Sequence, residues 1–436
     1  MAERKVDKRK NVNPLESTRL IGEAVDHYYY EELMKAHEQG RMVSWYVGYP
    51  VVQILQAMDI SYLVTEQYGA RHAARHEEAP LLATADAWGI SQEVCSYLRC
   101  SLACALYKLG KVTPPPNAPI TATQMDSPDF VLCTHPICNQ EPEWAQVIGE
   151  WYNVPVFMVE VPHCWDESRV EHSVDVLTQY FYDMIEFIEK QTKRPFEWDR
   201  LKEIVAETKR CSIYRAELLE LGKNIPSPVS FWDLAIAIAL TYFLVGRPES
   251  TRIMKMMRDE AQDRVNRGEG CIKGEEKYRL FTGAMACWPK FGWAADLYAD
   301  KGAAVICGDY THLGWYEDPT IIDPEKPIES LARVVAAYEL NHGFPWKVDA
   351  YSKLAQDFSC DGLVMHGVRS CRPWSGDHLE LLDSMTRRLG IPGMFVDGDN
   401  ANPQFVSTAQ VETRLQALLE TIDAQRIAGM GRPLKK

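Results

Sequence analysis

Twelve cysteines are spread along a chain of 436 residues, and three of them stand where chemistry would be expected. Cys95 opens the segment Cys-Ser-Tyr-Leu-Arg, whereas Cys138 and Cys371 each follow a short apolar run. In a reducing compartment thiols stay free, so many cysteines in an intracellular enzyme indicate metal binding or catalysis before disulfides. These three are far apart in sequence, so only the folded chain could bring them together.

Other cysteines compete for the same role. A buried free cysteine usually behaves as a small apolar side chain, so Cys100 and Cys104, on the helix predicted from Ser91 to Leu109, are expected to pack in the core. Cys133 lies inside an apolar run and is also expected in the core, yet its place five residues before Cys138 makes it the main alternative ligand. The sequence has no Cys-x-x-Cys pair, so a structural zinc site is not expected.

Composition excludes several classes of protein. A formal net charge of −14 argues against nucleic-acid binding, which needs a basic surface. The first ten residues are highly charged and lack the apolar core of a secretory signal. The longest apolar run, 234–245, is too short to cross a bilayer. We therefore expect a cytoplasmic protein without membrane attachment.

Apolar strand-like runs alternate with helical stretches along the chain. Buried strands without polar alternation, separated by helices, are typical of parallel sheets covered on both faces. The sequence therefore predicts an α/β fold with two Rossmann-like domains, plus N-terminal and central helical segments. The predicted parts are an N-terminal helical arm (1–40), a first α/β domain (41–225), a helical connector (226–275) and a second α/β domain (276–436). Strands are predicted at 42–48, 62–64, 130–133, 154–159, 280–285, 303–307, 362–365 and 393–396.

The predicted strands indicate where the candidate cysteines and histidines lie in the fold. Ligands of parallel α/β folds bind beyond the carboxyl ends of the strands, where Cys138 and Cys371 are expected to lie. Cys360 precedes its strand and is expected at the opposite end. His135 and His163 also follow predicted strands and are candidates for a catalytic acid, although a lone loop histidine more often has a structural role.

Several short segments resemble the 2-hydroxyacyl-CoA dehydratase / benzoyl-CoA reductase family over about residues 48–419. Their order and spacing carry the likeness, although each one alone is short. Asn139 stands where that family usually has aspartate after its second cysteine. The matching segments are Cys95–Arg99, Asp129–Leu132 leading to Cys138, Asp361–Val364 leading to Ser370-Cys371, Leu389–Pro392 and Glu412–Glu420.

The resemblance implies one of two homologous subunits, each carrying a [4Fe-4S] cluster held by three cysteines, here Cys95, Cys138 and Cys371. It also implies reduced ferredoxin as the electron source and a separate ATP-hydrolysing activator. The sequence contains no Gly-x-x-x-x-Gly-Lys-Ser/Thr loop, in keeping with ATP being bound by the partner subunits.

For the reaction, the resemblance favours the larger of the two cluster-bearing subunits of ATP-dependent benzoyl-CoA reductase. Such an enzyme reduces the ring of benzoyl-CoA, or of an analogue, to a cyclic dienoyl-CoA. One alternative is a subunit of a 2-hydroxyacyl-CoA dehydratase, which works through a ketyl radical without net reduction. The other is a non-catalytic subunit that only relays electrons.

Overall fold

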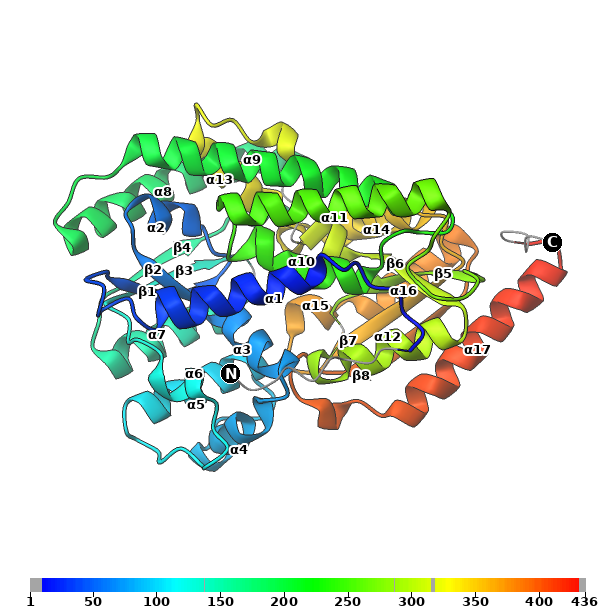
Figure 1. Cartoon of the computed structure of the whole chain (residues 1–436), viewed down its shortest axis with the longest axis horizontal. Coiled ribbons are helices and arrows are strands. Elements are labelled where there is room, and N and C mark those ends of the chain that lie inside the picture. The colour runs from blue at the N-terminus through cyan, green and yellow to red at the C-terminus, as the bar shows by residue number, and fades with distance from the viewer. Residues whose placement is uncertain (1–9, 137, 286, 315–317, 431–436) are drawn as a thin grey trace.

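The computed structural model describes residues 10–136, 138–285, 287–314 and 318–430. Two four-stranded sheets, each with parallel strand pairs throughout, form the centres of two α/β halves, which confirms the predicted fold class (Figure 1). The strands are β1 (Val43–Gly48), β2 (Ser61–Val64), β3 (Phe130–His135), β4 (Val156–Glu160), β5 (Tyr278–Gly283), β6 (Ala303–Gly308), β7 (Gly362–Val368) and β8 (Gly393–Gly398).

The two sheets share one strand order. The first runs β2-β1-β3-β4 and the second β6-β5-β7-β8, so each half repeats the same winding. In both halves the order reverses between the two central strands, β1 and β3 in one and β5 and β7 in the other. Parallel sheets of this kind bind ligands outside the carboxyl ends of the strands at that reversal.

All eight predicted strands are present, with bounds that differ by at most three residues. They were predictable because every residue of β1, β2, β5 and β6 is buried, so these strands are mostly apolar and lack the polar alternation of a half-exposed strand. β3 continues two residues past its predicted end, to His135. The predicted boundaries between arm, domains and connector stay predictions.

One helix begins later than its sequence indicates. The helix predicted from Ser91 starts instead at Ser96, with Cys95 as its N-cap residue. The Ser91 hydroxyl accepts the N–H of Glu93 at 3.2 Å and so closes a local turn rather than capping the helix. The shift places Cys95 at the entry of the helix instead of within its first turns.

The central segment is helical, as predicted, but divided into two helices. The first, α10 (Phe231–Tyr242), starts with a reciprocal capping box between Ser230 and Asp233. The second, α11 (Pro248–Arg267), has proline at its first position, where the missing N–H costs nothing. α11 packs along α9 (Trp198–Leu221), and the pair runs along one edge of the molecule (Figure 1).

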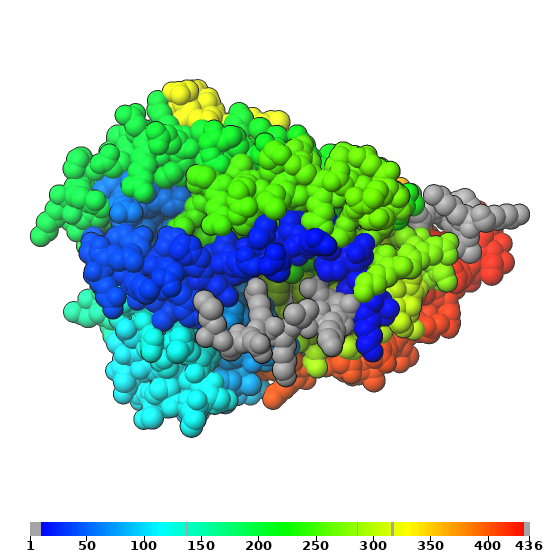
Figure 2. All heavy atoms as spheres, viewed as in Figure 1, coloured from blue at the N-terminus to red at the C-terminus, as the bar shows by residue number. Residues whose placement is uncertain are grey.

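The N-terminal segment runs across the second half before α1 (Thr18–His27) begins. The N–H of Asn13 donates to the carbonyl oxygen of Cys271 at 2.8 Å, and the N–H of Leu15 donates to the carboxylate of Asp233 at 3.0 Å. Figure 2 shows this blue segment and α1 stretched across one face of the molecule. The N-terminal segment is therefore bound to residues that lie more than two hundred positions later in the chain.

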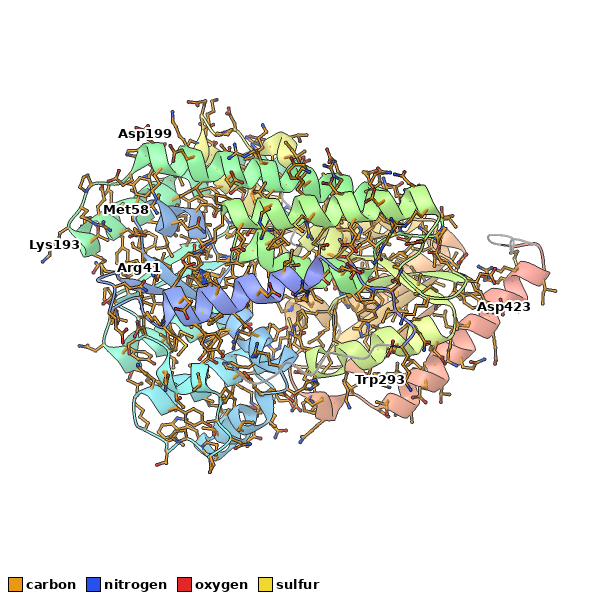
Figure 3. All side chains as sticks on the ribbon, in the orientation of Figure 1. Arg41, Met58, Lys193, Asp199, Trp293 and Asp423 are labelled. Carbon is orange, nitrogen blue, oxygen red and sulfur yellow. The ribbon has the colours of Figure 1, made fainter. Side chains whose placement is uncertain are left out.

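Helices surround the sheets of both halves. Lys193 lies at the outer end of the first half and Asp423 at the outer end of the second (Figure 3). Within the described residues, no helix combines the length and the apolar character needed to cross a membrane. The other helices are α2 (Val52–Ala57), α3 (Thr65–Ala74), α4 (Glu78–Trp88), α5 (Ser96–Lys108), α6 (Ile120–Gln124), α7 (Gln140–Tyr152), α8 (Val170–Thr192), α12 (Phe291–Asp300), α13 (Pro327–Ala336), α14 (Phe344–Asp357), α15 (Arg372–Ser375), α16 (His378–Leu389) and α17 (Thr408–Ile427).

Candidate functional site

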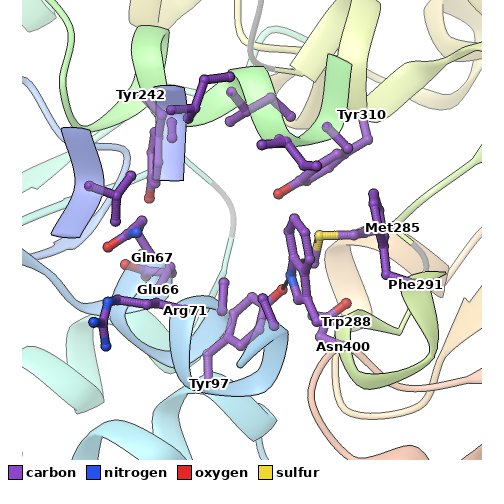
Figure 4. Close-up of a pocket in the computed structure, with 18 of the residues that line it drawn as sticks. Glu66, Gln67, Arg71, Tyr97, Tyr242, Met285, Trp288, Phe291, Tyr310 and Asn400 are labelled. Carbon is purple, nitrogen blue, oxygen red and sulfur yellow. Dashed lines mark hydrogen bonds between the residues drawn. The ribbon is translucent and has the colours of Figure 1, made fainter. Parts of the chain in front are cut away.

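A cavity of about 1070 Å³ lies between the two halves. Its wall includes residues that follow β1, β3, β5 and β7, the strands on either side of each reversal in strand order. Side chains from α1, α3 and α10 complete it. Figure 4 shows aromatic and carboxyl side chains pointing into this space from several elements. The structure therefore has a cavity of ligand size at the carboxyl ends of the central strands, where parallel α/β folds bind their ligands.

The three cysteines singled out from the sequence all line this cavity. Cys95 is the N-cap residue of α5, Cys138 stands two residues before α7, and Cys371 is the N-cap residue of α15. Burial is the main cause that raises the pKa of each thiol, to about 12 for Cys371. The charge of Cys371 further raises the pKa of the other two, which places the three thiols within electrostatic reach of one another.

Hydrogen bonds fix the cysteine segments to each other. The N–H of Cys95 donates to the side-chain oxygen of Gln140, two residues after Cys138, at 2.7 Å. The N–H of Ser96 donates at 3.2 Å to the hydroxyl of Ser370, which precedes Cys371. Loops from both halves are thus held in one arrangement by contacts next to the thiols.

The hydroxyl of Ser370 also donates to the carboxylate of Asp399, which fixes its orientation. Ser96 adds a second link to the second half, because its hydroxyl accepts a hydrogen bond from the N–H of Ala401 at 3.1 Å. Ser96 and Ser370 are both buried. A buried polar pair whose hydroxyls are hydrogen-bonded in this way holds a single geometry.

The competing cysteines lie elsewhere. Cys133 is fully buried within β3, and Cys100 and Cys104 are buried along α5; none of these three lines the cavity. Cys360 precedes β7, as expected, and its sulfur lies 3.5 Å from that of Cys307. Cys133 lies within β3 and Cys138 follows that strand, and of these two only Cys138 lines the cavity.

Neither candidate histidine lines the cavity. His135 ends β3 beside Glu160 and is half-buried, and burial lowers its pKa. His163 is exposed and packs near Trp165, with ring centroids 6.1 Å apart. Their role as proton donors stays a prediction, and the cavity offers other acids in their place.

Two half-buried glutamates, Glu66 of α3 and Glu141 of α7, line the cavity and were missed by the sequence reasoning. Burial raises the pKa of Glu66 to about 7, and burial together with the charge of Glu66 raises the pKa of Glu141. One oxygen of Glu141 has no hydrogen-bond partner among the described residues. Such a pair retains a proton near neutral pH and can donate it.

Gly48 holds this pair together. Its N–H donates to Glu66 at 2.8 Å. Its φ is +83°, and an added Cβ would lie 2.2 Å from the carbonyl oxygen of Thr134 and 3.0 Å from a carboxyl oxygen of Glu141. Only glycine fits this turn at the end of β1. Acidic residues in a first helical turn usually face solvent, which is why the sequence did not reveal the pair.

A close helix contact positions Cys95. Gly69 of α3 faces α5, and an added Cβ would lie 2.7 Å from the Cα of Tyr97. This close approach brings the start of α5 against α3, which carries Glu66. Tyr97, two residues after Cys95, then reaches across the cavity to the second half, where its hydroxyl accepts the indole N–H of Trp288 at 2.7 Å.

Two parallel α/β halves that close over one cavity, with thiols supplied by both, define a two-domain subunit with a composite site. Comparison with known proteins gives the family. The family model of the 2-hydroxyglutaryl-CoA dehydratase D-component matches residues 47–422, and the chain belongs to this family.

Known relatives resemble the chain over nearly its whole length. It is 26% identical to the alpha subunit of (R)-2-hydroxyisocaproyl-CoA dehydratase from Clostridioides difficile, covering 92% of this chain and 95% of the relative. It is 26% identical to the alpha subunit of (R)-phenyllactyl-CoA dehydratase from Clostridium sporogenes (91% and 93%). It is 25% identical to one of the benzoyl-CoA reductase subunits from Thauera aromatica (91% and 92%). Each relative is named as one subunit of a larger enzyme, so the family works as part of multi-subunit catalysts.

Proposed function

We propose that this chain is one of two cluster-bearing subunits of an enzyme that transfers single electrons to a CoA thioester. The single observation that carries the proposal is the meeting of Cys95, Cys138 and Cys371 in one cavity. Thiolates are the usual ligands of iron–sulfur clusters, and three of them would leave one iron open to a substrate. When bound, a [4Fe-4S] cluster would supply low-potential electrons.

We propose the three thiols as ligands of a cluster and not of a single ion. Within the described part of the chain, no three His, Cys, Asp or Glu side chains are grouped closely enough to hold one metal ion. In a cubane each thiolate binds a different iron, so its ligands stand farther apart than those of a single ion. Burial keeps the unbound thiols protonated, so loading of iron would release protons.

The glutamate pair would supply protons to the substrate. Dearomatising a benzoyl ring to a cyclic diene consumes two electrons and two protons, so an acid must stand in the cavity. A carboxyl of Glu141 that stays protonated near neutral pH can transfer one proton to the ring, and Glu66, whose pKa is raised to about 7, can supply the second from its own protonated form. The cavity is large enough for an acyl group and part of its thioester carrier.

The particular reaction we favour is ATP-dependent benzoyl-CoA reduction. Its support is the presence of a benzoyl-CoA reductase among the relatives and the aromatic lining of the cavity. The second candidate is dehydration of a 2-hydroxyacyl-CoA, favoured by relatives named as dehydratase alpha subunits. There the same acid would protonate the departing hydroxyl group. A subunit that only relays electrons needs no substrate-sized cavity and has less support.

The proposed partners follow from this chemistry. A homologous cluster-bearing subunit would complete the enzyme, and an ATP-hydrolysing activator would pass on electrons from reduced ferredoxin. ATP would be bound by those partners and not by this chain. The proposed site of action is the cytoplasm.

The test is an anaerobic assay of the assembled enzyme with reduced ferredoxin, ATP and separate CoA thioesters. Diene formation from benzoyl-CoA with stoichiometric ATP use supports the reductase. Dehydration of a 2-hydroxyacyl-CoA after only catalytic ATP use establishes the dehydratase instead. Full activity with Cys95→Ser, Cys138→Ser and Cys371→Ser together would refute the proposed cluster site.

A further inference from the structure

We propose that the cavity accepts a neutral, flat aromatic acyl group and rejects acyl groups that carry a carboxylate. The determinant is a wall formed by Tyr97, Met285, Trp288 and Phe291, which we call the aromatic wall. This inference rests on the proposed function, because it concerns the acyl group of the same thioester. It goes further by naming the side chains that select the substrate.

The polar atoms of the aromatic wall are already paired. The indole N–H of Trp288 donates to the hydroxyl of Tyr97 at 2.7 Å, and that hydroxyl donates to the sulfur of Met285 at 3.5 Å. Neither donor is therefore free to bind a polar substituent on the acyl group. The wall presents ring faces and a thioether to the cavity (Figure 4).

The wall is also held flat and in place. The rings of Trp288 and Phe291 stack, with centroids 5.1 Å apart and planes inclined by 23°. The backbone N–H of Trp288 donates to the carbonyl oxygen of Asn400 at 3.0 Å. Aromatic rings pack well in offset-stacked or edge-to-face arrangements, so a fixed ring face favours a flat aromatic guest.

The wall stands beside the proposed cluster site. Among the charges that raise the pKa of Tyr97 are those of Cys95, Cys371 and Tyr310, although burial is the larger cause. Tyr310 points into the cavity from the second half in Figure 4. An aromatic ring resting on the wall would therefore lie close to the thiols, where electrons would be delivered.

Charge in the cavity opposes an anionic acyl group. Three guanidinium groups line it: Arg71 and Arg75 pair with Asp26 at 3.2 and 3.0 Å, whereas Arg19 pairs with Glu23 at 3.0 Å where both side chains are exposed to solvent. No lysine is among the described lining residues. A substrate carboxylate beside the aromatic wall would lose water without gaining a hydrogen bond from the paired donors of that wall, which is costly.

The glutamate pair adds to this exclusion. Glu66 and Glu141 share the cavity, and whichever carboxyl of the pair is ionised would repel a substrate carboxylate. A neutral ring meets neither penalty. The structure thus separates phenyl-type acyl groups from glutaryl-type ones by charge, not by size.

The experiment measures binding to the assembled anaerobic enzyme by calorimetry, with unreactive thioethers of CoA. The three probes are S-benzyl-CoA, S-(cyclohexylmethyl)-CoA and S-(3-carboxypropyl)-CoA. We expect the benzyl probe to bind at least about tenfold more tightly than the carboxypropyl probe, with the cyclohexylmethyl probe between them. Equal or tighter binding of the carboxypropyl probe would overturn the inference.

Two variants locate the selectivity. Trp288→Ala should weaken benzyl binding about tenfold and leave carboxypropyl binding unchanged. Tyr97→Phe removes the hydrogen-bond acceptor of the Trp288 indole N–H, which could then bind a substrate carboxylate. The ratio of benzyl to carboxypropyl affinity should therefore fall. The matched control is Tyr107→Phe on the same helix, whose hydroxyl contacts Thr84 away from the cavity and which should retain full selectivity.

If Trp288→Ala fails to fold, Trp288→Leu keeps bulk while removing the ring face and should give the same loss. Unchanged selectivity in both folded Trp288 and Tyr97 variants would refute the role of the wall. Failure of the proposed function has a different signature, since none of the three probes would then bind and no thioester would be converted. Conversion of carboxylated thioesters at full rate overturns the inference alone.

Discussion

Replacing Gly69 by alanine should disturb the site through a single methyl group. The added Cβ would lie 2.7 Å from both the Cα and the Cβ of Tyr97 and 3.0 Å from its carbonyl oxygen. Carbon atoms pack best at about 3.5–4.0 Å, so α3 and α5 would have to separate by about 1 Å. Since both contact atoms belong to helices, no flexible side chain can absorb the change.

A shift of that size reaches the candidate site directly. The hydrogen bond between Trp288 and Tyr97, now 2.7 Å, would stretch to about 3.7 Å and be lost. Overpacking costs about 1–3 kcal/mol and a lost hydrogen bond about 1 kcal/mol, offset by about 1 kcal/mol for alanine over glycine in a helix. The net loss in free energy of unfolding should be about 1–3 kcal/mol.

Urea unfolding followed by circular dichroism measures this loss, and iron and sulfide analysis after anaerobic purification measures cluster loading. Gly69→Ala should unfold at lower urea and retain less iron. The control is Gly274→Ala, where the added Cβ meets nothing within 4 Å. A Gly69→Ala protein as stable as wild type, with full iron, would show that the contact between α3 and α5 does not position Cys95.

Three further predictions concern the thiols, the acid pair and the serine link. Cys371→Ser should strip iron and sulfide from the protein, whereas Cys133→Ser should keep both; the reverse result would make Cys133 the ligand. The raised pKa of Glu141 means that its protonated form favours the folded state, so the free energy of unfolding should fall as pH rises through that pKa. Glu141→Gln should flatten this pH dependence in thermal melts, and an unchanged slope would contradict it. Ser370→Ala removes one hydrogen-bond partner from Asp399 and from the N–H of Ser96 and should cost about 1–3 kcal/mol of stability by urea unfolding, whereas Ser407→Ala, whose side chain caps nothing, should cost none.

Sequence reasoning located the strands because parallel strands buried on both faces are short apolar runs that stand out between helices. It located Cys138 and Cys371 for a related reason, since residues after central strands lie at the edge where ligands bind. The start of α5 was harder, because Ser91 has the residue type of a helix cap but uses its hydroxyl in a turn.

The acid pair and the aromatic wall could not be predicted from the sequence. Glu141 lies in the first turn of a helix, where acidic residues are common on the surface, and its close approach to Gly48 inside the cavity exists only in the folded chain. The hydrogen bond between Tyr97 and Trp288 spans 191 positions of sequence, and no local pattern announces it. The expectation of histidine acids rested on residue type and strand ends, without knowledge of which loops face inward.

The long reach of the N-terminal arm sets an order of events during synthesis. The backbone N–H groups of Lys10 and Asn11 donate to Asp296, which is 286 and 285 positions later in the chain. The arm is synthesised before Asp296 and must therefore wait until that residue has been translated before it can dock. Contacts of such separation form slowly, since the intervening chain must first be ordered. The cavity wall contributed by α1 is thus completed only after α12, which carries Asp296, has been translated.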